Sequence, residues 1–242
     1  AINGCFTCDN KRFLRFWWEV GGSKLLCAKN DYKKWFSYQK GDGYKKWYGN
    51  NDYVVNFSDG GKEIRTKRME VGQSHSLPGE DWYFKEGTTY SYLTAGSFSA
   101  RFADDKGLFD IAGSSLFSSN NLEILGLLNT RITTFILKLL NPTVNFQVGD
   151  LRRLPIPNKP NSEVANLVTQ CIELARQDSR ESEITYDFVR PLASIGDFTA
   201  RKSLLADKEA EIDQVASLLY GLTEEDLAAI DQELSGTAAR SE

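Results

Sequence analysis

The sequence predicts an α+β protein in which a mixed, β-rich domain over residues 1–157 contains one buried helix and precedes a helical tail over residues 158–242. Short segments with two-residue alternation, separated by glycine-rich breaks, predict strands of irregular length in the front part. After a proline-rich segment, the apolar residues repeat with the spacing of a helix instead.

The clearest strand pattern lies in residues 14–20, where Leu14, Phe16, Trp18 and Val20 point to one side and the residues between them to the other. We expect further strands at residues 53–57, 82–84, 108–111 and 144–148. Glycine-rich breaks at residues 21–22, 41–43, 59–61 and 113 separate these segments.

Residues 122–140 predict a single helix that is apolar on most faces and is therefore buried against the sheet. Asn120 or Asn121 is a suitable cap at its start, and Pro142 ends it. Residues 154–160 then predict an extended linker and a domain boundary, since three of the seven are proline.

Beyond the linker, apolar stripes over residues 164–175 and 212–219 predict two helices, the first with Ser162 near its cap. Gly221 stands where a helix commonly ends in the left-handed conformation. Thr223 and Asp226 resemble a capping box that opens a last helix through residue 234.

Charge is divided along the chain. The net charge of −4 by itself argues against a nucleic-acid-binding protein, but residues 1–68 contain 14 lysines and arginines against few acids. Acidic residues dominate from Glu163 onward. A DNA-facing front on a solvated support would produce this asymmetry.

Other features bear on location. The sequence has no apolar run of membrane-spanning length and no secretory signal, so no membrane partner is expected. Four cysteines without a disulfide framework favour the reducing cytoplasm. Because the chain begins at Ala1 without Met, we interpret it as a fragment or a processed piece.

Metal binding and hydrolysis are disfavoured. Cys5 and Cys8 form a Cys-x-x-Cys pair, but only Cys27 and His75 remain as further ligands, at no recognised spacing, so no metal is expected. His75 is the only histidine, and no Gly-x-Ser-x-Gly elbow accompanies it, so an exposed loop histidine is expected. Phosphate-binding glycine loops are also missing from the sequence.

Residues 40–50 combine three lysines, three aromatic residues and Asn50 in a glycine-hinged segment. Lysine contacts phosphates, asparagine pairs with adenine, and aromatic rings stack on bases. A solvated loop with its aromatic rings tucked into the core explains the same composition equally well.

Five segments in collinear order resemble the target-recognition domains of adenine-specific DNA methyltransferases. The first contains Gly4, Thr7, Asp9, Asn10, Phe13 and Arg15, with Cys8 where the family usually has glycine, which affects the expected turn geometry. The others lie at residues 40–50, 97–113, 125–130 and 140–157. Residues 183–188 are similar to a spacer element beyond that domain. The resemblance is strongest to the large methyltransferases of BREX phage-defence systems (PglX-like), then to type IIG restriction-modification enzymes and type I specificity subunits.

The resemblance implies a module that recognises double-stranded DNA and directs N6-adenine methylation by a separate catalytic domain. That catalytic domain, in the same or another chain, would be the partner and would bind S-adenosylmethionine; no cofactor and no catalytic residue are expected here, because the family's Asn-Pro-Pro-Tyr-type motif is missing. The candidate DNA-binding residues are Asn10, Arg12, Arg15, Lys40, Lys45, Lys46, Asn50, Arg65, Arg68 and Arg101.

Two other functions remain open. The acidic helical tail could dock a catalytic subunit, which would make the chain a protein-interaction or specificity subunit. A nuclease would need clustered acids and a basic residue around a metal ion, and no Pro-Asp…Glu-x-Lys spacing is evident.

Overall fold

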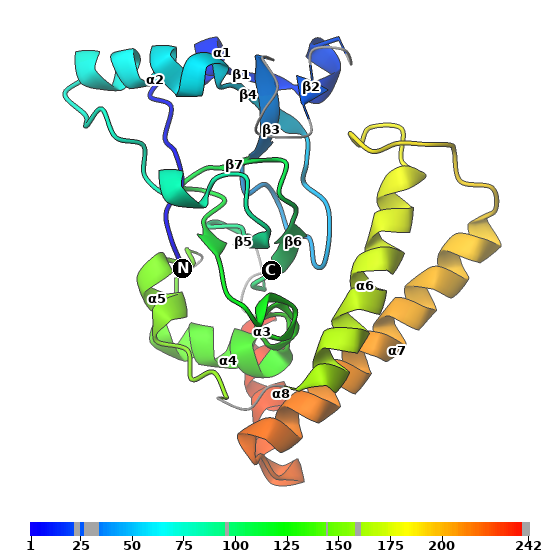
Figure 1. The fold of residues 1–242 in the computed structure, drawn as a ribbon. Helices are drawn as coiled ribbons and strands as arrows, with labels where there is room; N and C mark the ends of the chain where they lie inside the picture. The colour runs from blue at the N-terminus through cyan, green and yellow to red at the C-terminus, as the bar shows by residue number, and fades with distance from the viewer. Residues whose placement is uncertain (22–24, 27–33, 95–96, 144, 158–160, 239–242) are drawn as a thin grey trace.

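The computed structural model describes residues 1–21, 25–26, 34–94, 97–143, 145–157 and 161–238, which form two small sheets and a set of helices (Figure 1). The strands are β1 (Leu14–Phe16), β2 (Leu25–Leu26), β3 (Trp35–Gln39), β4 (Tyr53–Asn56), β5 (Gly87–Tyr90), β6 (Ala100–Ala103), β7 (Gly107–Phe109) and β8 (Ser115–Leu116). The helices are α1 (Asn10–Phe13), α2 (Ser58–Glu70), α3 (Asn121–Leu128), α4 (Arg131–Leu140), α5 (Val148–Arg152), α6 (Ser162–Arg180), α7 (Ile195–Tyr220) and α8 (Glu224–Ala238).

The first sheet is built around β3. Strand β4 runs antiparallel to β3 and carries β1 on its other side, whereas β2 and β7 both pair with β3 in parallel. One face of the sheet packs Phe36, Tyr38 and Val55 against Leu108 and, from α2, Ile64.

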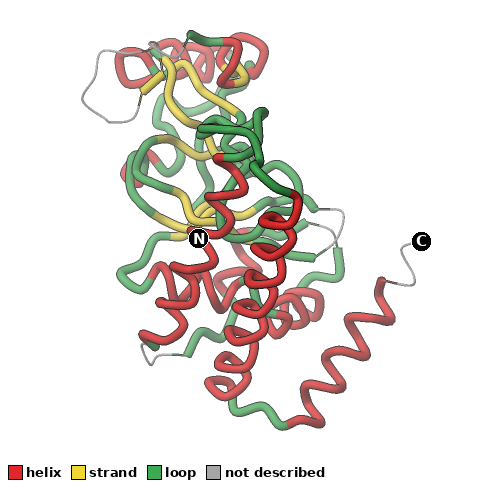
Figure 2. The backbone as a smooth tube through the Cα atoms, turned by 90° about the vertical axis from the view of Figure 1, so that its right-hand side faces the viewer, coloured by secondary structure: helices red, strands yellow, loops and turns green. Residues whose placement is uncertain are grey.

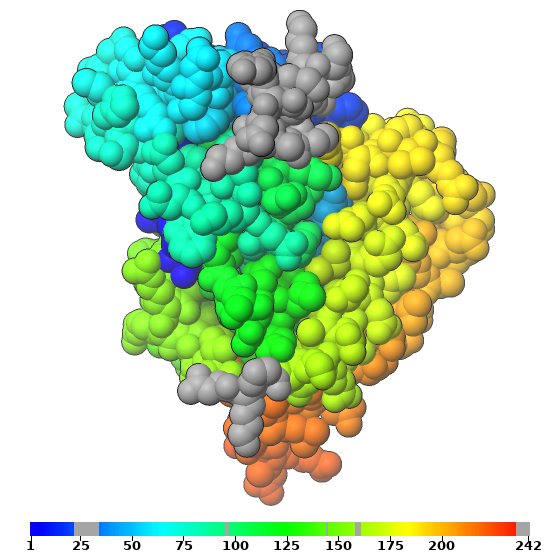
Figure 3. Space-filling model, in the orientation of Figure 1, coloured from blue at the N-terminus to red at the C-terminus, as the bar shows by residue number. Residues whose placement is uncertain are grey.

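The second sheet, in the order β6-β5-β8, packs against helices. Its Tyr90 and Ala100 share one core with Leu125 of α3, Val168 of α6 and Ile212 of α7. Figure 3 shows α6 and α7 lying along the side of the front part. The helical tail therefore packs on the front part, while the boundary at residue 157 stays a prediction.

The predicted α+β fold with a helical C-terminal region is confirmed. The prediction of one helix over residues 122–140 is wrong, because α3 ends at Leu128 and α4 begins at Arg131. Between them, Thr130 caps α4 by accepting a hydrogen bond from the Thr133 N–H at 3.2 Å. The side chain of Asn129 bonds the backbone of Ala100 in β6 instead of supporting a continuous helix.

The strand predictions have mixed outcomes. Strands β4 and β7 confirm those at 53–57 and 108–111, but the strand from residue 14 ends at Phe16 and gives way to a 3-10 turn, Trp17–Glu19. The prediction at 82–84 is wrong, since Glu80–Trp82 is a 3-10 turn. For 144–148, residue 144 lies outside the described residues, Asn145 forms only an isolated bridge and Val148 opens α5.

The tail follows its predicted caps closely. Gly221 ends α7 with a φ of 68°, and Thr223 and Asp226 exchange capping hydrogen bonds of 2.8 and 3.2 Å. Asn161, rather than Ser162, caps α6. Part of the predicted linker, residues 158–160, lies outside the described residues. Among the helices of the described segments, none has the length and apolar character needed to cross a membrane.

Candidate nucleic-acid interface

The structure separates the ten predicted DNA-binding residues into three groups. Asn10, Arg12 and Arg15 lie on α1 and β1, near the start of β3; Lys40, Lys45, Lys46 and Asn50 lie in the loop after β3, with Arg101 on β6 behind it; Arg65 and Arg68 lie on α2. The first group borders β3 through its contact with Trp35, the second follows the last residue of β3, and the third lies on a separate helix. No single cluster therefore contains all ten.

Two basic side chains near the start of β3 lie over one indole ring. The Arg15 guanidinium lies 5.7 Å from the centre of the Trp35 ring, and the Lys34 ammonium lies 5.6 Å from it. Arg15 also donates a hydrogen bond of 2.8 Å to the backbone carbonyl of Lys11. We call Lys11, Arg15, Lys34 and Trp35 the Trp35 cluster. Its two lysines are exposed, so their charges face solvent.

Arg12 and Asn10 border the Trp35 cluster. Arg12 pairs with Glu63 of α2 at 3.0 Å, with 53% of both side chains exposed. Such an exposed pair contributes little, so a phosphate can replace the carboxylate. Asn10 is exposed and accepts a hydrogen bond of 2.8 Å from Thr7, which leaves its amide NH₂ as a donor. Cys8, where the family usually has glycine, adopts the left-handed conformation that glycine favours, with a φ of 61°.

The loop over residues 40–50 packs largely against the helical tail. Trp47 is buried, and its indole N–H donates to Glu209 of α7 at 2.5 Å. The Lys46 ammonium lies 3.2 Å from the other oxygen of the same carboxylate. The guanidinium of Arg176 on α6 lies 4.8 Å from the centre of the Tyr48 ring, which is also buried. Lys46, Trp47 and Tyr48 therefore pack against the helical tail and are not free to contact a ligand.

The remaining residues of the loop differ in what they can contact. Lys40 forms an ion pair with the buried carboxylate of Asp110. Asn50 has a φ of 56° and donates to the backbone carbonyl of Asp42. Lys45 is exposed; its backbone N–H donates to the Ser99 hydroxyl at 3.1 Å and its backbone carbonyl accepts from Arg101, and no hydrogen bond of its ammonium group is seen within the described residues. Lys45 is therefore the cation of this loop that is available to a ligand.

Two of the predicted contacts do not fit the structure, because Arg101 and Arg68 are buried. Arg101 is fully buried and donates to Ser91 at 3.0 Å, while its Nε and Nη2 atoms have no partner among the described residues. Burial lowers the pKa of Arg101 to about 10. Arg68 donates to the carbonyl of Phe6 at 2.7 Å. Neither guanidinium reaches the surface of this conformation.

Arg65 is also committed within the protein. Its guanidinium bonds the Gly60 carbonyl at 3.0 Å and pairs with Glu80, and this pairing lowers the pKa of the Glu80 carboxyl. His75, whose carbonyl also accepts a bond from Arg65, is exposed as expected. Of the ten residues, Asn10, Arg12, Arg15 and Lys45 remain the ones placed to contact a ligand.

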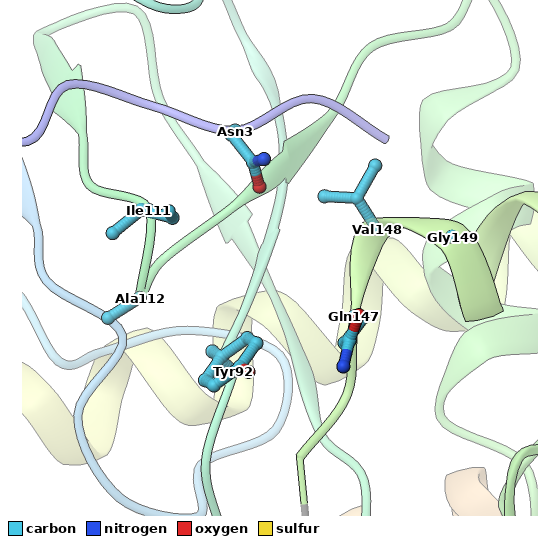
Figure 4. Close-up of a pocket in the computed structure, with 7 residues that line it drawn as sticks. All are labelled: Asn3, Tyr92, Ile111, Ala112, Gln147, Val148 and Gly149. Carbon is cyan, nitrogen blue, oxygen red and sulfur yellow. The ribbon is translucent and has the colours of Figure 1, made fainter. Parts of the chain in front are cut away.

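A pocket of about 510 Å³ lies between the N-terminal segment, the segment after β5, the turn after β7 and the start of α5 (Figure 4). Its lining residues are Asn3, Tyr92, Ile111, Ala112, Gln147, Val148 and Gly149. This pocket was not predictable from the sequence, because residues that line it lie up to 146 positions apart. Lys11 and Lys34 were also not predicted as site residues, because the contact of Arg15 with both the Lys11 backbone and the Trp35 ring appears only in the folded chain.

Metal ligands are not grouped in the described part of the chain, where no set of three or more His, Cys, Asp or Glu could hold an ion. Cys5 is buried, and burial raises the pKa of its thiol to about 11. Cys27 lies outside the described residues.

The structure is an α+β protein whose front part carries an exposed basic cluster and whose helical tail packs on that front part. Comparison with known proteins then identifies its relatives. No protein-family model matches the chain. It is 32% identical over 181 residues to the adenine-specific methyltransferase BrxX of Escherichia coli O9:H4 (strain HS), and 32% identical over 199 residues to the adenine-specific methyltransferase PglX of Lacticaseibacillus casei (strain Zhang). These matches cover 73% and 78% of the chain but 14% and 16% of the relatives. The chain is therefore related to the BREX-type adenine-specific methyltransferases and spans about a seventh of their length.

Proposed function

We propose that this chain is the part of an adenine-specific DNA methyltransferase that recognises the target sequence in double-stranded DNA. The relationship to BrxX and PglX supports a methyltransferase context. The observation that supports DNA contact is the Trp35 cluster, in which Arg15 and Lys34 lie over one ring and the Lys11 backbone accepts a hydrogen bond from Arg15. Such clustering suits the phosphate backbone, which dominates affinity in most protein–DNA complexes.

In this proposal the residues have different tasks. Lys11, Arg15 and Lys34 neutralise phosphates and set the register, and the amide of Asn10 reads a base edge, for which adenine offers a matching donor and acceptor. Methyl transfer belongs to a separate catalytic part that binds S-adenosylmethionine and extrudes the target adenine from the duplex. With DNA as the ligand, we expect a cytoplasmic protein.

A selection from a randomised duplex library, repeated at two salt concentrations, tests this function. The proposal predicts enrichment of one short adenine-containing sequence at both concentrations. The variant Asn10→Ala should relax selection at one position of that sequence, whereas Asn51→Ala, at an amide that bonds Gln39 within the protein, serves as the matched control. Uniform enrichment that disappears with salt would contradict sequence recognition.

Helix α8 supports a second candidate function, docking of a methyltransferase subunit. Figure 2 shows α8 at the edge of the molecule, where Ile230 packs against Ile132 of α4 and Asp231 pairs with Arg131. Its first turn contains Glu224, Glu225 and Asp226, and Ile230 is its one buried residue among those whose side chains are described. Recovery of a separate methyltransferase polypeptide with the full chain, and its loss when these three acids become amides, would favour this function.

A further inference from the structure

From the pocket lined by Asn3, Tyr92 and Gln147, we infer a second DNA contact: the pocket binds a nucleobase that has left the base stack, with Tyr92 stacking on it and Asn3 and Gln147 bonding its edge. This inference rests on the proposed function and extends it to a base outside the duplex. The pocket volume of about 510 Å³ falls in the range usual for small-molecule sites.

The pocket walls are held in place by backbone hydrogen bonds. The Tyr92 N–H donates to the Ala112 carbonyl at 2.9 Å, and the Tyr92 carbonyl accepts from the Phe146 N–H at 2.7 Å. These bonds connect Tyr92 to the two segments, 111–112 and 147–149, that line the pocket beside it. On either side of Asn3, the N–H groups of Ile2 and Cys5 donate to the β7–β8 region at 2.8 Å. The pocket is therefore a formed feature before any ligand arrives.

The lining matches the chemistry of a nucleobase. None of the lining side chains is charged, which favours a neutral ligand over a phosphate or a carboxylate. Asn3 and Gln147 border the same space as the Tyr92 ring (Figure 4). The Ser114 hydroxyl lies within hydrogen-bond distance of both the Ile111 carbonyl, at 2.8 Å, and the Asn3 amide oxygen, at 3.0 Å, and the NH₂ group of Asn3 can donate to a ligand. A nucleobase can stack on the Tyr92 ring, and the donor and acceptor on its edge can bond the amides of Asn3 and Gln147.

The loop that carries Lys45 borders this pocket. The hydroxyl of Ser91, the residue before Tyr92, donates to the carbonyls of Asp42 and Gly43 at 2.9 and 3.0 Å. Gly41 lies so close to Ala112 that an added Cβ would be 1.8 Å from its carbonyl oxygen. An exposed cation on the neighbouring loop suits the phosphate that accompanies an extruded base.

The test uses the full chain with three probes: a paired duplex, the same duplex with one unpaired 2-aminopurine, and free adenosine. The inference predicts tighter binding of the bulged duplex, with quenching of 2-aminopurine fluorescence by the Tyr92 ring. Tyr92→Ala should lower the affinity for the bulged duplex about tenfold. Tyr92→Phe keeps the aromatic ring and should leave that affinity unchanged.

Gln147→Ala changes an exposed residue and should weaken binding of the bulged duplex but not of the paired duplex. The matched control is Gln170→Ala, on the exposed face of α6. Equal binding of paired and bulged duplexes, with no effect of Tyr92→Ala or Gln147→Ala, would overturn the pocket and leave the proposed function standing. Binding of adenosine without either duplex would support the pocket as a nucleoside site and contradict the proposed function. Binding of no probe would overturn both.

Discussion

Glu209 joins the 40–50 loop to the helical tail, so its removal has a calculable cost. Its carboxylate accepts from the indole of Trp47 at 2.5 Å and from Lys46 at 3.2 Å. Trp47 is 1% exposed, so Glu209→Ala would leave a buried donor without a partner. A charge-assisted bond of this kind contributes about 2 kcal/mol, and we expect Glu209→Ala to lower the free energy of unfolding by that amount.

Glu209→Gln keeps an acceptor for the indole and loses only the ion pair, which should cost about 0.5 kcal/mol. The matched control is Glu211→Ala on the same helix, since Glu211 is exposed and its ion pair among the described residues is with Lys208. Thermal unfolding followed by circular dichroism should show a decrease in Tm of about 4–8 °C for Glu209→Ala. Equal Tm values for Glu209→Ala and Glu211→Ala would refute the reasoning.

Three further predictions separate packing from binding. Lys45→Ala should weaken DNA binding without a change in Tm, whereas Lys46→Ala should lower Tm, as anisotropy and thermal unfolding would show; the reverse assignment would contradict the structure. Gly126→Ala should destabilise by about 1–3 kcal/mol, because the added methyl would lie 2.6 Å from a valine of α6, whereas Gly149→Ala meets no atom and should not destabilise in urea unfolding. Asn129→Ala should cost about 2 kcal/mol in the same assay, because two buried backbone bonds to β6 are lost, and a cost near zero would contradict this.

The helical tail was predictable because its signals are local. The stripe over residues 164–175 and the caps at Gly221 and Thr223 depend on residues within one or two helical turns. The break between α3 and α4 was not predictable from apolar spacing, because it depends on Asn129 reaching a strand 29 residues earlier. Strands β3 and β5 were missed because they are buried on both faces and show no alternation.

Composition located the basic front of the candidate site but not its exposed charges. Arg101 and Lys45 were equivalent candidates in the sequence, yet one is fully buried and the other is exposed. Lys46 pairs with Glu209, which lies 163 residues further along the chain. Only the packing of α7 against the loop shows that this lysine is already paired.

The salt dependence of duplex binding tests the central claim most directly. The double variant Lys11→Ala/Lys34→Ala removes two exposed charges of the Trp35 cluster, and Lys138→Ala/Lys202→Ala removes two lysines elsewhere, on α4 and α7. If both cluster lysines contact phosphates, the slope of log K against log salt should become less steep by about 1.8, while the control pair leaves it unchanged. An unchanged slope for the cluster variant, or an equal change in the control, would contradict DNA binding through this face.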